Sequence, residues 1–84
     1  MKIGYTKHAE KKFKDLAALG MTINKRLVNN TVKKPVHLDE ATDPPNKIAS
    51  GELDKKRILR VVYREEGDRI VVVTFYPARK GRYF

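Results

Sequence analysis

The sequence contains no cysteine, no tryptophan and no glutamine in its 84 residues. Without cysteine, disulfides, thiolate metal sites and thiol nucleophiles are excluded. No apolar run approaches the roughly 20 residues that a membrane-spanning helix needs, and the first residues lack the apolar core of a signal peptide. We therefore expect a cytoplasmic protein that has no membrane partner.

Acidic residues are scarce as well: the chain has 10 Asp and Glu against 19 Lys and Arg, which gives a formal net charge of +9. A chain of this length forms one small domain that buries about 60% of its unfolded surface, so an enzyme with separate cofactor and substrate domains is excluded. The 40% of hydrophobic residues still suffice for a core. The charge favours an anionic partner, most often nucleic acid, and the alternative is a protein that is merely basic.

The basic residues are unevenly distributed along the chain. Residues 1–34 carry a net charge of +7, residues 35–56 carry −2 and residues 57–84 carry +4. Eleven of the 12 lysines lie before residue 57, whereas six of the seven arginines lie at or after it. Because a planar guanidinium binds phosphate through two hydrogen bonds and stays charged, we expect phosphate chemistry in the C-terminal third.

A short strand and two helices are predicted in the N-terminal part. Residues 2–5 alternate weakly, and Thr6 is a suitable N-cap for a helix over residues 7–19 that Gly20 ends. Thr22 is a similar cap for a helix over about residues 23–33, and the short connection between the helices predicts a helical hairpin. Apolar residues at helical spacing predict the inward faces. They are Ala9, Phe13, Leu16 and Ala17 in the first helix and Ile23, Leu27, Val28 and Thr31 in the second.

After Pro35 the hydrophobic pattern changes to the alternation of β-strands. Residues 36–38 and 47–49 predict two short strands, the second of which ends at Ser50 and Gly51. Two longer strands, over residues 57–66 and 69–76, are joined by Gly67 and Asp68 in a two-residue hairpin turn. We therefore expect an α+β domain over residues 1–84. Its first strand and helical hairpin pack on one face of a twisted antiparallel sheet of about four strands.

The two-residue turn also predicts which side chains of the hairpin share a face. It pairs Glu66 with Arg69, and each later pair follows from that register. Tyr63 and Tyr76 then point into the core, whereas Arg60 and Arg64 share the open face with Phe75. An open sheet face with arginines and an aromatic side chain suits RNA binding. The alternative is a solvated face on which the arginine stems cover valines, and a bulge would exchange the two faces.

The two ends of the chain carry a resemblance to a known family. Residues 74–83 run from a strand into Arg79, Lys80, Arg82 and Tyr83, and this segment resembles the end of RelE-superfamily toxins, including the BrnT branch. Residues 5–9, Tyr-Thr-Lys-His-Ala, resemble the start of uncharacterised domains close to that superfamily. The order of the predicted elements matches the family across the chain.

The resemblance implies a metal-independent endoribonuclease without a cofactor. It would cut RNA, typically messenger RNA on the ribosome, and an antitoxin protein would inhibit it. Attack of the ribose 2′-OH on the adjacent phosphate needs a base, cations that stabilise the phosphorane, and an acid for the leaving oxygen. By resemblance, Arg60 and Arg79 hold the phosphate and Arg82 is the second C-terminal arginine. Tyr83 would stack on a base or move a proton, and His8 is a candidate base or acid because histidine exchanges protons near neutral pH.

Further candidate contacts to RNA are cationic or aromatic. They are Lys7, Lys11, Lys12, Arg64, Phe75 and Lys80. The chain departs from the family pattern, because its middle strands are poor in Lys and Arg and its second histidine, His37, lies near Asp39 in the acidic segment. His37 and Asp39 alone make no metal site. Two hypotheses follow: a RelE-like ribonuclease, or a non-catalytic RNA- or ribosome-binding module of the same fold.

Overall fold

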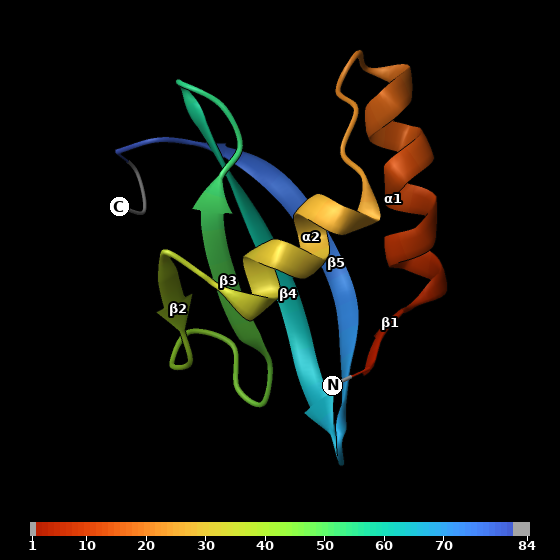
Figure 1. Ribbon diagram of the computed structural model, residues 1–84, viewed down its shortest axis with the longest axis vertical. Helices are drawn as coiled ribbons and strands as arrows, with labels where there is room; N and C mark the ends of the chain where they lie inside the picture. Colours follow the sequence, from red (N-terminus) through yellow and green to blue (C-terminus); the bar gives the residue numbers. More distant parts are fainter. Residues whose placement is uncertain (1, 82–84) are drawn as a thin grey trace.

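The computed structural model describes residues 2–81. In chain order the elements are β1 (Lys2–Tyr5), α1 (Lys7–Ala18), α2 (Lys25–Lys33), β2 (His37–Asp39), β3 (Lys47–Glu52), β4 (Arg57–Glu66) and β5 (Arg69–Arg79). The strands form one sheet in the order β1-β5-β4-β3-β2, with both helices on one of its faces (Figure 1). The predicted α+β fold class is thus confirmed, with five strands and with β1 parallel to β5. No helix of residues 2–81 is long and apolar enough to cross a membrane.

The start of α1 is as predicted, whereas α2 begins later. The Thr6 side chain accepts a hydrogen bond of 3.1 Å from the N–H of Ala9, and Gly20 ends the helical segment with a φ of 82°. The N-cap of α2 is Asn24 rather than Thr22, because the Asn24 Oδ1 accepts from the N–H of Leu27 at 2.9 Å. Ile23 is 4% exposed and therefore fills the core from the connection between the helices.

The two helices cover different strands of the same face. α1 packs on β5 and β1, and α2 crosses β3 and β4 (Figure 1). Most of the predicted inward residues are buried or pack on the core, but Ala17 is exposed and Val32 is buried in addition. The helices thus form the covered side of a two-layer domain. No helix of the described residues lies over the opposite side of the sheet.

β3 is longer than the sequence indicates. It continues through Ser50 and Gly51 to Glu52 instead of ending there. A Cβ atom at Gly51 would lie 3.3 Å from the side chain of Thr31 on α2. Glycine at this position therefore lets the helix approach the strand closely, and it does not break the strand.

The β4–β5 hairpin contains an irregularity that the turn rule cannot predict. Glu66 pairs with Arg69, as expected, and the predicted register continues as far as Tyr63 and Val72. A β-bulge follows, after which Val62 pairs with Thr74. Val73 is the extra residue on β5. From this point on, the side chains of β5 point to the faces opposite to those predicted.

Thr6 binds both carbonyl groups at the bulge. Its backbone N–H donates to the oxygen of Val72 at 3.0 Å, and its hydroxyl donates to the oxygen of Val73 at 2.9 Å. Two predictions about the hairpin are consequently wrong. Phe75 is fully buried beneath α1, with its ring centroid 4.6 Å from that of Phe13, and Tyr76 points to the helix-free face.

Candidate functional site

Four polar side chains form a row across the helix-free face. His37 on β2 pairs with Ser50 on β3, Ser50 pairs with Arg60 on β4, and Arg60 pairs with Tyr76 on β5. Ala49, Leu59, Val61 and Phe75, which adjoin Ser50, Arg60 and Tyr76 along the strands, belong to the core on the helix side. Alternation therefore directs Ser50, Arg60 and Tyr76 to the opposite face, and cross-strand pairing with Ser50 places His37 on that face as well. We call these four residues the cross-strand row.

Arg60 is the central residue of the row, and its side chain is held in place. Its Nε donates to the Tyr76 hydroxyl oxygen at 3.0 Å, and its Nη1 donates to Ser50 Oγ at 3.2 Å. It is 4% exposed, and its same-face neighbours on β4, Ile58 and Val62, are buried. In this apolar surrounding the positive charge is less screened than it would be in water.

The pKa of Asp39 on β2 is lowered by hydrogen bonds and, to a smaller extent, by the charge of Arg60. The Thr42 side chain and the backbone N–H groups of Ala41 and Thr42 bind its carboxylate. These hydrogen bonds, with a smaller contribution from the charge of Arg60, lower the pKa of Asp39 to about 2. Asp39 is therefore an anion at neutral pH, and it occupies the same face of β2 as His37.

The structure separates the sequence-predicted catalytic residues from one another. Arg60 points to the helix-free face, whereas His8 lies on α1, which covers the other face. Arg79 pairs with Arg57, three residues along β5 from Tyr76 and about 10 Å away along the strand. Alternation also places Arg79 on the helix side, opposite to the face of Arg60, so the structure does not bring these two side chains together. Arg82 and Tyr83 lie outside the described residues.

The predicted RNA contacts are also scattered. Lys7 and Lys11 are exposed on α1 and Lys12 is half-buried there, on the helix side of the sheet. Arg64 lies on the helix-free face and forms an ion pair with Glu66, which lowers the pKa of that carboxyl group. Lys80 forms an ion pair of 3.0 Å with Glu52. Phe75 is part of the core and offers RNA no surface.

No protein-family model, no curated protein and no solved structure matches this chain. The geometry of the described residues is therefore the basis on which a function can be proposed. Membership in the RelE superfamily stays a prediction from the short segments at the two ends of the chain.

Sequence reasoning missed three members of the cross-strand row. Tyr76 was predicted in the core because the bulge was unknown, and Ser50 was interpreted as a strand breaker. His37 was interpreted as part of the acidic segment, although alternation in the short strand already placed it on the same face as Asp39. Within residues 2–81 no cluster of three or more His, Cys, Asp or Glu side chains is suited to bind a metal ion.

Proposed function

We propose that this protein is a metal-independent endoribonuclease and that the cross-strand row is its active site. The observation that carries the proposal is the order of the row. His37 and Tyr76 lie on opposite sides of the buried guanidinium of Arg60, and the small Ser50 side chain separates His37 from it. In-line displacement at phosphorus needs this order, because the attacking and leaving oxygens lie on opposite sides of the phosphate.

The row supplies each part of a transesterification. His37 takes the proton of the ribose 2′-OH as this oxygen attacks phosphorus. Arg60 stabilises the charge of the phosphorane, and Tyr76 donates its proton to the departing 5′-oxygen. The products are a 2′,3′-cyclic phosphate and a 5′-hydroxyl, and solvent then returns both residues to their starting protonation states. Because the Tyr76 oxygen accepts the bond from Arg60, its own proton is directed elsewhere and can be donated.

Other features of the chain support RNA as the substrate. The net charge of +9 attracts a polyanion, and a sheet face without a helix over it is a common platform for single-stranded RNA. The resemblance of the two ends of the chain to RelE-superfamily toxins extends the proposal to messenger RNA on the ribosome. By the same resemblance we propose a cytoplasmic location and inhibition by an antitoxin protein.

A second candidate function is a non-catalytic RNA- or ribosome-binding module. The observation that favours it is the burial of Arg60, which is 4% exposed and donates to Ser50 and Tyr76 inside the fold. A guanidinium in this setting can serve to connect three strands rather than to bind phosphate. In this case RNA would bind through surface lysines, and no cleavage would occur.

Cleavage of a single-stranded RNA in the presence of EDTA separates the two functions. We expect the wild-type protein to cut the RNA, and His37→Gln and Arg60→Lys to cut it roughly 100-fold more slowly or worse, since each removes one group from the reacting centre. His8→Gln is the matched control because His8 lies on a helix across the sheet, and it should retain the wild-type rate. Equal losses in the two histidine variants would contradict the proposed site.

Translating ribosomes provide the test of the messenger RNA proposal. Primer extension on the message should reveal cleavage sites with the wild-type protein and none with Arg60→Lys. Intact messages across all codons, in the presence of well-folded protein that binds RNA, would instead support the binding module.

A further inference from the structure

A cavity of about 620 Å³ lies at the open end of the β4–β5 hairpin. The loop between β3 and β4 forms one wall, and the last residues of β5 form the other. Its lining consists of Asp54, Lys55, Lys56, Arg57, Pro77, Ala78 and Arg79. The surface inside is mainly apolar, while four cationic side chains and one carboxylate surround it, which gives a local net charge of +3. An anionic ligand with an apolar body fits this combination.

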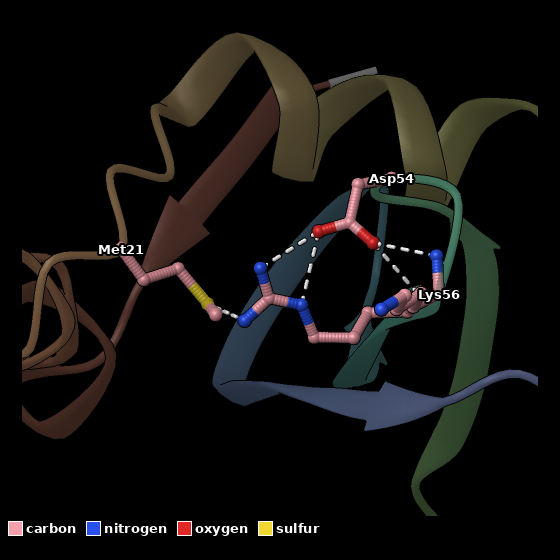
Figure 2. Close-up of polar contacts among 4 residues, drawn as sticks. Met21, Asp54 and Lys56 are labelled. Atoms are coloured by element: carbon pink, nitrogen blue, oxygen red, sulfur yellow. Dashed lines mark hydrogen bonds and ion pairs between the residues drawn. The ribbon is translucent and has the colours of Figure 1, made fainter.

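One of the arginines at the cavity is already neutralised within the protein. The Nη2 of Arg57 lies 2.7 Å from the Asp54 carboxylate, which also accepts from the backbone N–H groups of Lys56 and Arg57. Figure 2 shows the Asp54 carboxylate directed at the guanidinium and at Lys56, while the sulfur of Met21 lies on the other side of the guanidinium. The hydrogen bond from Arg57 is the main reason why the pKa of Asp54 is lowered. Asp54 therefore stays charged and pairs with Arg57.

Arg79 has no such partner within residues 2–81. It lies directly opposite Arg57 across the hairpin, an arrangement of like charges that destabilises a sheet. Among the described residues, no carboxylate forms an ion pair with Arg79, and its side chain is exposed. The cavity thus places one available guanidinium at its edge, beside the apolar surface of Pro77 and Ala78.

The cavity lies at the end of the sheet and borders both of its faces. Ala78 pairs with Ile58 and points to the same face as Tyr76, two residues and about 7 Å along the strand. Pro77 and Arg79 alternate with Ala78 and therefore lie on the helix side, so the cavity is a site separate from the cross-strand row.

We propose that this cavity is a nucleotide subsite, separate from the cross-strand row. Arg79 binds the phosphate of the nucleotide, and the apolar surface of Pro77 and Ala78 contacts its base. The planar guanidinium matches phosphate through two hydrogen bonds, and the cavity volume lies within the range for small-ligand sites. Binding of a nucleotide in the cavity does not rest on the proposed ribonuclease function.

Adenosine 5′-monophosphate is the probe, and the ¹H–¹⁵N NMR spectrum of the full-length protein is the readout. We expect the nucleotide to shift the amide signals of Lys56, Ala78 and Arg79, and to bind more tightly than adenosine or inorganic phosphate alone. Arg79→Gln should weaken this binding at least about tenfold, since it removes a charge-assisted hydrogen bond to phosphate. The matched control is Arg26→Gln, because Arg26 is exposed on α2 and is not among the lining residues, and it should bind like the wild type.

Equal weakening in Arg79→Gln and Arg26→Gln, or amide shifts elsewhere in the molecule, would overturn the subsite. The same holds if an acidic peptide of equal charge displaces the nucleotide at an equal concentration, since the cavity would then recognise charge alone. His37→Gln should leave nucleotide binding unchanged, which separates the two proposals. RNA that stays intact while the nucleotide still binds in the cavity would defeat the ribonuclease, and cleavage without nucleotide binding would defeat the subsite.

Discussion

The Nε atom of Arg60 donates a hydrogen bond of 3.0 Å to the hydroxyl of Tyr76, which lies directly opposite it on the neighbouring strand. Tyr76 reaches this position because one extra residue, Val73, forms a bulge in β5. Without the bulge, Phe75 would face Arg60 and Tyr76 would lie beneath α1. The bulge therefore places Phe75 in the core and Tyr76 on the helix-free face.

Tyr76→Phe should slow RNA cleavage by about 10²- to 10⁴-fold, because it removes the proposed proton donor. Its cost in stability should be about 1.5–3 kcal/mol, the loss of one hydrogen bond to a charged group. The control is Tyr63→Phe, since Tyr63 is buried on the helix side of the sheet. The rates of RNA cleavage by the two variants test whether Tyr76 is the proton donor. Equal rates would contradict this role.

Phe75→Ala should destabilise the protein by about 3–5 kcal/mol, the usual cost of truncating a buried aromatic side chain. The reason is that Phe75 is fully buried and contacts Phe13. Urea denaturation followed by circular dichroism measures this loss. A loss of less than about 0.5 kcal/mol in the free energy of unfolding is typical of surface sites and would contradict the burial of Phe75.

Thr6→Ala should cost about 1–2 kcal/mol, because the hydroxyl caps α1 and also donates to the Val73 carbonyl at the bulge. Thr22→Ala is the matched control. Thr22 is exposed and α2 is capped by Asn24 instead, so this change should stay within about 0.5 kcal/mol. If unfolding in urea gives similar free energies for the two variants, the capping assignment is wrong.

Protonation of Asp39 in acid should lower the free energy of unfolding. Its pKa in the folded protein is about 2, below the ordinary 3.8, so the charged carboxylate stabilises the native state above about pH 4. This contribution is lost as the pH falls through about 2. A carbon-detected NMR titration should give a midpoint near 2 for Asp39. Asp39→Asn should weaken the dependence of stability on pH between 5 and 2, and an unchanged dependence would contradict this role.

Local patterns predicted those parts of the fold that local interactions determine. The cap at Thr6 and the turn at Gly67 and Asp68 each involve residues that are near one another in sequence. The bulge is different, because the hydroxyl that binds its carbonyl belongs to Thr6, 67 positions earlier in the chain. No rule for a two-residue turn contains that information, so the register was right near the turn and wrong beyond Val73.

The candidate site was harder to predict for the same reason. Arg60 was assigned to the face away from the helices by alternation along β4, which the extra residue on β5 does not interrupt, and the structure confirms that placement. Ser50 and Gly51 are small residues that usually weaken strands, yet here Gly51 makes room for Thr31, and Ser50 accepts a bond from Arg60. Their roles depend on partners on other elements, which a single sequence does not reveal.

The central claim is that the cross-strand row promotes attack by a ribose 2′-OH. The most direct test compares a single-stranded RNA with the same RNA carrying one 2′-deoxynucleotide at the cleavage site, both in EDTA. We expect the all-ribose strand to be cut to products that end in a 2′,3′-cyclic phosphate, and the deoxy-substituted strand to stay intact at that site. Cleavage of both strands at that position, or of neither, would contradict the claim.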